Sequence, residues 1–168
     1  MILLKYGFKL NNYNNMGFFS NLKNKITGGG AKVSLEVETP KFNSPFKVTI
    51  SALESNADIE IQKVYVAVKS VEKATVRNVE VLGFDGVSKE RKDVFGEETI
   101  YPRTEFVISG PQSLKANESY TWSKEISISG MGMPTYRGKN AQHEWMLLAG
   151  LDAPGNDPDS GWSSIDMF

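Results

Sequence analysis

The chain is 168 residues long and carries 19 basic and 20 acidic side chains, a net charge of -1. This balance creates no long-range field that would gather nucleic acid or an anionic membrane, so no nucleic-acid partner is expected. The absence of cysteine excludes disulfides, thiolate nucleophiles and Cys-ligated zinc. No stretch approaches the roughly 20 apolar residues that span a bilayer, so no integral membrane contact is expected.

Residues 1–30 are expected to form a leader and a short amphipathic helix. Residues 1–15 lack a signal-peptide cleavage site, and a run typical of a natural start opens at Met16, so they are interpreted as lying outside the fold. Between Met16 and Ile26 the apolar residues share one side of a helical wheel, and Gly28–Gly30 then end the helix. The helix is expected to cap the domain; the alternative is an arm for a membrane or a partner.

Two segments after the glycines alternate between apolar and polar residues. The pattern runs through Ala31–Val37 and again through Phe46–Ala52, with a turn between them that contains Pro40 and Pro45. Each segment therefore has one apolar face and one polar face, as half-buried antiparallel strands do.

The next segments are less regular. Ile59–Val71 changes phase part-way, which predicts a β-bulge near Gln62 and Lys63. Thr75–Leu82 is a weaker strand candidate. Gly83–Arg103 holds nine charged residues and little periodicity, so it is expected to be a long exposed loop or an irregular edge.

Strand patterns return in the second half of the chain. Phe106 and Ile108 indicate a strand, and Tyr120–Ile128 alternates cleanly. Ser129–Asn140 is expected to be a loop, and His143–Leu151 is apolar on both faces, as in a central strand. About seven strands without a βαβ rhythm predict one all-β domain over residues 31–168, an antiparallel immunoglobulin-like β-sandwich.

Several short motifs resemble the bacterial sporulation-control protein family, which belongs to the arrestin-like group. The resemblance covers residues 16 to about 165, and its motifs are Met16-Gly17-Phe18-Phe19, Gly30-Ala31-Lys32-Val33, Ile61–Val66, Tyr120-Thr121-Trp122, Pro134-Thr135 and Trp145–Asp152. It implies an arrestin-like sandwich in the bacterial cytoplasm that acts as an adaptor or regulator without chemistry of its own. The family has two tandem sandwiches, whereas this chain holds enough residues for only one.

No combination of residues predicts catalysis. The only histidine, His143, is in strand phase with Trp145 and Leu147, which favours a packed residue over a general base. The sequence has no Gly-x-Ser-x-Gly elbow. Gly28–Lys32 leads into a strand and lacks the spacing of a phosphate-binding loop. We therefore expect no enzyme, no catalytic residue and no cofactor.

A cluster of acidic residues near the end of the chain is the only metal candidate. Asp152, Asp157 and Asp159 are oxygen ligands of the kind that calcium uses, and Asp157–Gly161 faintly resembles a calcium loop. Pro158 separates two of the carboxylates, and no glutamate closes the loop. Ordinary turn formation is the alternative for this segment.

The three tryptophans allow a second alternative. Trp122, Trp145 and Trp162 could form an aromatic surface for a sugar, although Trp122 and Trp145 are in phase with aliphatic neighbours and are expected in the core. Trp162, in the turn-rich tail, is the one expected to be exposed.

The preferred hypothesis is a non-enzymatic protein-interaction module in the cytoplasm. Its partner would be another protein, bound by strand addition at an open sheet edge or by the loops Gly83–Arg103 and Ser129–Asn140. The alternatives are a carbohydrate- or calcium-binding module and a structural assembly subunit. A homo-oligomer is compatible with each of them.

Overall fold

The computed structural model describes residues 31–53, 57–130, 132–155 and 157–168, and this part of the chain is entirely β-structure. It contains ten strands and no helix, so none of its elements is a helix that could cross a membrane. The predicted all-β sandwich is confirmed. The expected leader and helix in residues 1–30 lie outside the described residues.

The smaller of the two main sheets has three strands in the order β1-β2-β7, all antiparallel. Its strands are β1 (Lys32–Glu38), β2 (Pro45–Leu53) and β7 (Ser119–Ser127). The alternation seen in the sequence gives this sheet its buried face: Val33 lies opposite Ala52, and Leu35 opposite Ile50, all four being buried.

The larger sheet has the order β10-β9-β4-β5, with β8 pairing with β9 beside β10. Its strands are β4 (Lys63–Leu82), β5 (Lys89–Ser109), β8 (Tyr136–Arg137), β9 (Ala141–Asp152) and β10 (Ser163–Ile165). The prediction of a central, doubly covered strand at His143–Leu151 is confirmed by β9, which lies between β4 and β10. A two-stranded sheet of β3 (Ile59–Ile61) and β6 (Gln112–Leu114) lies at one end.

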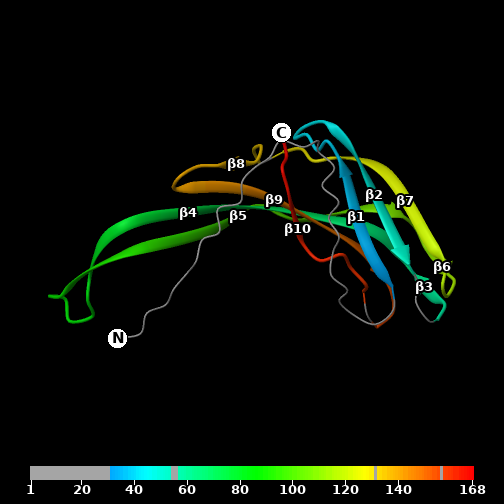
Figure 1. The fold of residues 1–168 in the computed structure, drawn as a ribbon, viewed down its shortest axis with the longest axis horizontal. Helices are drawn as coiled ribbons and strands as arrows, with labels where there is room; N and C mark the ends of the chain where they lie inside the picture. The colour runs from blue at the N-terminus through cyan, green and yellow to red at the C-terminus, as the bar shows by residue number, and fades with distance from the viewer. Residues whose placement is uncertain (1–30, 54–56, 131, 156) are drawn as a thin grey trace, which may run out of the picture.

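The two main sheets enclose one large hydrophobic core at the right-hand side of the molecule in Figure 1. Val64, Val66 and Val68 of β4 face this core, and so do their partners on β9, which are Leu151, Ala149 and Leu147. Trp145 is fully buried near one end of it, where its indole Nε1 donates a hydrogen bond of 2.7 Å to the carbonyl of Met133. The rings of Phe42 and Tyr101 flank the indole, with centroids 5.7 and 5.2 Å away.

The change of phase near Gln62 and Lys63 has a different cause from the predicted bulge. The chain leaves β3 at Ile61 and enters β4 at Lys63, so it passes from the small two-stranded sheet to the large sheet. Gln62 forms the bend between them, and its N–H donates to the carbonyl of Asp152 at 2.7 Å. The side chains change phase where the strand changes sheet, and the register shift nearest to the predicted bulge lies between Val64 and Tyr65, with its extra residue on β5.

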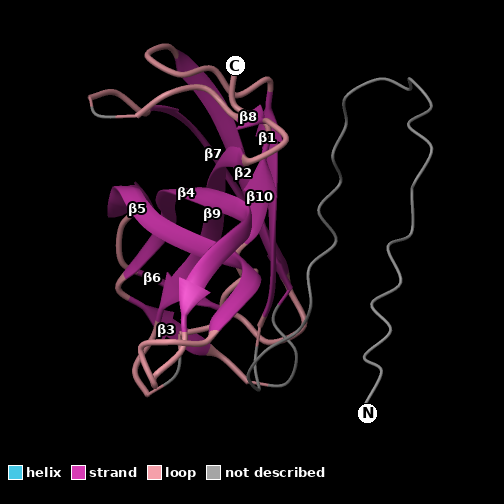
Figure 2. Cartoon of the chain, turned by 90° about the vertical axis from the view of Figure 1, so that its left-hand side faces the viewer, coloured by secondary structure: helices cyan, strands magenta, loops and turns pink. Residues whose placement is uncertain are grey.

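The largest correction concerns Gly83–Arg103, for which a long loop or an irregular edge was expected: it is not a long loop, and most of it belongs to an irregular edge strand. Residues 89–103 belong to β5, and only residues 83–88 form a turn between β4 and β5. The two strands make a long hairpin that extends far beyond the sandwich, in green on the left of Figure 1, and Figure 2 looks at the molecule from that side. Its outer half has no buried face, so its sequence carries no two-residue hydrophobic periodicity.

The weaker strand prediction for Thr75–Leu82 is confirmed. The predicted loop Ser129–Asn140 contains the short β8.

Candidate interaction surface on the β4–β5 hairpin

The outer half of the hairpin, here called the arm, consists of residues 72–82 of β4, the turn 83–88 and residues 89–99 of β5. No residue of the arm belongs to either hydrophobic core cluster of the described chain. Cross-strand pairing continues along almost its whole length, from Glu72 opposite Glu98 to Leu82 opposite Lys89. The arm is therefore held by backbone hydrogen bonds and surface contacts rather than by burial.

A row of polar side chains lies at the end of the core, where the arm begins. His143 is fully buried, with its Nε2 2.9 Å from Ser70 Oγ and its Nδ1 3.3 Å from the carbonyl of Pro134. Because a carbonyl only accepts, Nδ1 carries the proton and the Ser70 hydroxyl donates to Nε2. Tyr136 stacks on His143, and its hydroxyl donates to Glu72 at 2.6 Å, which raises the pKa of the Tyr136 hydroxyl. The expectation that His143 is a packed residue is confirmed.

Beyond this polar row, the core-facing side of the large sheet continues without a sheet to cover it. Side chains alternate along a strand, so the inner face that carries Val68 and Ser70 continues through Ala74 and Val76. Val76 is 59% exposed. Opposite these residues on β5 lie Gly96 and Val94, the latter 42% exposed, and a Cβ built on Gly96 meets open space.

A bulge keeps the valines of β4 on the inner face toward the tip. Between Val76 and Val79 the register shifts, because three steps on β4 match two on β5. Asn78 has a positive φ of 57°, and its N–H donates to Asp93 Oδ1 at 2.9 Å. The extra residue places Val79 and Val81 on the same side as Val76. The inner face of the arm thus carries small and β-branched residues on β4, while the residues that face Val79 and Val81 on β5 are Lys92 and Glu90.

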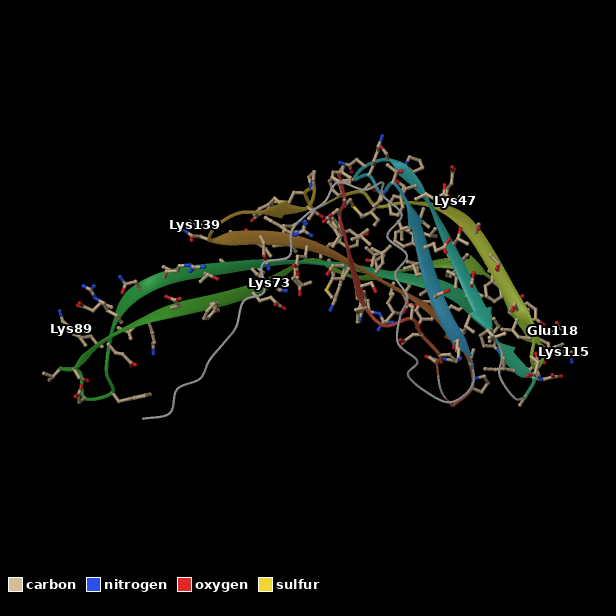
Figure 3. All side chains as sticks on the ribbon, in the orientation of Figure 1. Lys47, Lys73, Lys89, Lys115, Glu118 and Lys139 are labelled. Atoms are coloured by element: carbon tan, nitrogen blue, oxygen red, sulfur yellow. The ribbon has the colours of Figure 1, made fainter. Side chains whose placement is uncertain are left out.

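The outer face of the arm is aromatic and charged. Phe95 is 75% exposed there, opposite Thr75. Nearby, Lys73 Nζ lies 2.9 Å from Glu144 and 3.9 Å from Glu97, and the hydrogen bond to Glu144 raises the pKa of the Lys73 ammonium. A hollow of about 480 Å³ opens beside these residues, and Lys139 lines its rim. Figure 3 shows Lys73 near the base of the arm and Lys139 at the turn between β8 and β9.

The tip of the arm is an ordered turn that presents two apolar side chains. Asp85 Oδ1 accepts hydrogen bonds from the N–H groups of Val87 and Ser88 at 3.0 and 2.9 Å, and these bonds lower the pKa of the Asp85 carboxyl. Gly86 has a φ of 69°, which glycine adopts without strain. Phe84 is fully exposed and Val87 is 81% exposed. Figure 3 places Lys89, which follows the turn, at the far end of the molecule from the β1-β2-β7 sheet.

Both edges of the arm are open among the described residues. β5 is the outermost strand of its sheet. On the other side, β4 loses its neighbour after Thr75, whose N–H makes a last hydrogen bond of 2.7 Å to the carbonyl of Asn140. Unpaired N–H and C=O groups along such an edge are a template for another strand.

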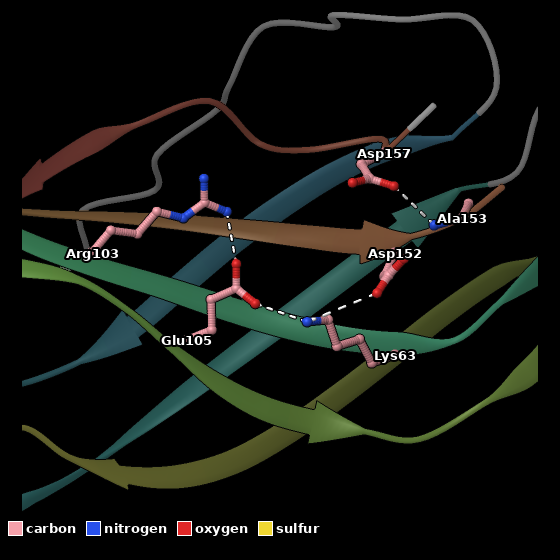
Figure 4. A network of polar contacts seen from close by, with 6 residues as sticks. All are labelled: Lys63, Arg103, Glu105, Asp152, Ala153 and Asp157. Carbon is pink, nitrogen blue, oxygen red and sulfur yellow. Dashed lines mark hydrogen bonds and ion pairs between the residues drawn. The ribbon is translucent and has the colours of Figure 1, made fainter. Parts of the chain in front are cut away.

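The proposed calcium ligands do not converge. Among the described residues, no group of three or more His, Asp or Glu side chains could hold a metal ion. Asp152 lies 3.8 Å from Lys63 Nζ at the end of β9 (Figure 4). Asp157 Oδ1 accepts from the N–H of Ala153 at 3.1 Å, and Asp159 Oδ1 accepts from the N–H of Gly161 at 2.7 Å. The two carboxylates thus stabilise the turns of their own segment.

Lys63 is the centre of a charge network on the outer face of the large sheet. Its Nζ lies 2.8 Å from Glu105, and Arg103 reaches the other oxygen of Glu105 at 2.8 Å (Figure 4). The hydrogen bond from Lys63 is the main cause that lowers the pKa of the Glu105 carboxyl. These charged side chains pair with one another, so we interpret the network as a solvated surface cluster.

The three tryptophans do not form one surface. Trp145 is in the core, as expected. Trp122 is half-buried against the core and stacks on Tyr120, with ring centroids 6.0 Å apart. Trp162, expected to be exposed, is half-buried on the outer face of the large sheet, with Lys69 Nζ 4.6 Å above its ring. No two of them share a solvent-exposed face.

Sequence reasoning missed the arm, although one signal was present. Asp85-Gly86 lies between a run containing Val79 and Val81 and another containing Val94 and Phe95. Asp-Gly between two β-branched or aromatic runs is a strong short-range hairpin signal. The charged residues between them concealed it, because charge was interpreted as a sign of a loop.

Comparisons with known proteins show the fold and nothing finer. No family model and no curated protein matches the chain. Among solved structures, it is similar to Spo0M, a sporulation control protein from Bacillus subtilis, with a TM-score of 0.53 and 17% sequence identity. The match covers 83% of this chain and 49% of Spo0M, so the chain spans about half the length of that protein. The chain therefore has a Spo0M-like β-sandwich fold.

Proposed function

We propose that this chain is a non-enzymatic protein-interaction module that binds a partner through the arm. The observation that carries the proposal is that the hairpin continues past the core with both faces and both edges uncovered by any other described residue. Large apolar side chains such as Val76, Phe84 and Phe95 are more than half exposed on it. Exposed apolar patches of this kind on a stable scaffold are typical of interaction sites.

The mode of binding follows from the open edge. An extended segment that lies along β5 would add a strand to the sheet, so that main-chain hydrogen bonds supply affinity and side-chain pairs supply specificity. The sandwich serves as the rigid base, because the arm continues β4 and β5, and the other halves of these strands are packed in the sandwich. The Spo0M-like fold supports a regulatory role of the same general kind, since Spo0M is described as a sporulation control protein.

The decisive experiment shortens the arm without disturbing the core. Thr75 and Phe95 lie opposite each other, so residues 76–94 can be replaced by Asn-Gly, a dipeptide that forms two-residue hairpin turns. The deletion removes no core residue. Thermal unfolding should therefore be close to that of the intact chain.

Intact and shortened proteins would then be used to capture partners from cells that produce the chain. The expected result is that the shortened protein loses the partners that the intact protein retains. Triple replacement of Val76, Phe84 and Phe95 by serine is a matched control that keeps the length of the arm. Identical partners for the intact and shortened proteins would overturn the proposal.

A further inference from the structure

The free edge of β5 in the arm has a charge and side-chain pattern that is complementary to itself. Residues 89–99 pair with β4 on one side and with no described strand on the other. Lys92 and Glu98 are exposed there, and neither side chain forms an ion pair or hydrogen bond with another described residue. These two opposite charges lie three residues to either side of Phe95. When such a strand pairs antiparallel with its own copy, each charge faces the opposite one.

Symmetry restricts how two copies of one strand can pair. A twofold axis normal to the sheet makes the copies antiparallel, and facing residues must lie on the same side of the sheet. Residue i of one copy then faces residue j of the other, with i and j equally far from the residue on the axis. Only a register centred on a residue is allowed, so the candidates can be compared one by one.

The register centred on Phe95 satisfies most of the pairs. It places Phe95 opposite its own copy, an aromatic pair of the kind that stabilises a sheet. Val94 falls beside Gly96 of the other copy, and a Cβ built on Gly96 meets open space, so the valine has room. Lys92 faces Glu98 of the other copy, twice by symmetry, as opposite charges directly across a pair of strands.

One pair in this register is unfavourable, and the arm already neutralises it. Asp93 would face Glu97 of the other copy. Asp93 Oδ1 accepts the hydrogen bond from Asn78 at 2.9 Å, and Glu97 lies 3.9 Å from Lys73 Nζ. Both carboxylates thus have partners within their own chain that offset the repulsion.

The neighbouring register is worse. Centring on Val94 places Glu90 opposite Glu98 and Asp93 opposite Phe95. This register also pairs Arg91 with Glu97, but it sets the like charges of Glu90 and Glu98 against each other, and it leaves Phe95 beside a carboxylate instead of an aromatic ring. Within residues 89–99, the register centred on Phe95 is the one that both pairs Phe95 with its own copy and brings Lys92 opposite Glu98.

We infer that the occupant of the β5 edge is a second copy of this chain, which adds antiparallel about Phe95 and joins the two arms into one continuous four-stranded ribbon. This inference rests on the proposed function and names its partner. The two sandwiches then lie at opposite ends of the ribbon, because β5 enters the sandwich only beyond Tyr101, which faces Lys89 of the other copy in this register. The bodies of the two domains do not meet.

The first test measures mass in solution by sedimentation velocity over a range of concentrations, with the full chain. A concentration-dependent dimer is expected. Lys92→Glu and Glu98→Lys should each weaken it by roughly tenfold to a hundredfold, since both symmetric contacts change from attraction to repulsion. Mixing the two variants should restore dimerisation as a heterodimer, because every contact is then again between opposite charges. Both residues are exposed, so folding should be unaffected.

The second test fixes the register and uses the absence of cysteine from the chain. Cross-strand Cα atoms about 4.5 to 5.5 Å apart suit a disulfide. Under mild oxidation Phe95→Cys should form covalent dimers, whereas Val94→Cys should not. Arg91→Cys should cross-link only when mixed with Thr99→Cys.

The outcomes separate this inference from the proposed function. A monomer at all concentrations, a dimer that persists after the arm is shortened, or a dimer that cross-links through Val94→Cys would each overturn it. If the chain is monomeric but the shortened protein still loses its partners, the self-pairing fails while the interaction role of the arm stands.

Discussion

Ser70 and His143 share a hydrogen bond of 2.9 Å between Oγ and Nε2 across β4 and β9, and this bond marks the end of the core. On one side of it lies Trp145, fully buried. On the other side the same sheet continues into the arm, where nothing among the described residues covers it. A buried polar pair is tolerated at this boundary because every hydrogen-bonding group in it has a partner.

Replacing His143 by alanine should lower the free energy of unfolding by about 2 to 4 kcal/mol, since it leaves a cavity and removes the partners of Ser70 and Pro134. Urea denaturation measures the loss. Ser70→Ala should cost less, because its small side chain leaves little space. A double-mutant cycle should show coupling between the two positions, and additive effects would contradict the structural role of the bond.

Gly150 is expected to tolerate no side chain, because a Cβ there would collide with the buried ring of Tyr65 on the neighbouring strand. Gly150→Ala should destabilise the fold by about 1 to 3 kcal/mol, as overpacking does. Gly96→Ala is the matched control, since its Cβ meets open space. In a Tyr65→Val background the cost of Gly150→Ala should largely disappear, and an unchanged cost would show that the ring is not its cause.

The tip of the arm should loosen when Asp85 is protonated or removed. Its carboxyl pKa is lowered by the backbone hydrogen bonds from Val87 and Ser88, so the ionised form is favoured in the folded turn. The stabilisation is therefore present above the ordinary value of 3.8 and is lost as pH falls through the lower folded pKa. Amide hydrogen exchange at Val87 and Ser88 should quicken in Asp85→Ala. Asp85→Asn, which retains an acceptor oxygen, should show a smaller change.

Lys63→Met should raise the pKa of Glu105 toward its ordinary value of 4.5, because the hydrogen bond from Lys63 is the main cause that lowers it. The contribution of the pair to stability is present above pH 4.5 and is lost as pH falls through the folded pKa of Glu105. Carbon-detected NMR titration of the carboxyl group measures the shift. Lys47→Met, which removes an ion pair from the other sheet, should leave the pKa of Glu105 unchanged.

Sequence patterns were informative wherever one side of a strand is buried. The alternation in Ala31–Val37 and Phe46–Ala52 predicted two strands and the face of each that enters the core. The apolar run at His143–Leu151 predicted a strand with neighbours on both sides, which β9 confirms. Burial selects side chains with a period of two residues, so the pattern and the structure have one cause.

The same reasoning did not predict the candidate site, because the arm has no buried face. In Lys89–Thr99 the residues face solvent on both sides, so burial selects nothing and the composition resembles that of a loop. The segment is a strand because its backbone pairs with residues 71–82 of β4. The local signals for this pairing were the Asp85-Gly86 turn and the strand candidate Thr75–Leu82 before it, and the charged composition outweighed them.

The amino-acid sequence alone determined that the chain is an all-β sandwich, that His143 is packed and that most of the core comes from residues 31–151, because hydrophobic burial produces a local periodicity along each strand. The core also takes in Ala153, Ile165 and Met167. Only the tertiary structure decided where the large sheet extends beyond the small one and which side chains this leaves uncovered. That outcome depends on the relative lengths of strands that lie far apart in the chain, and on pairing through backbone groups that every residue carries alike.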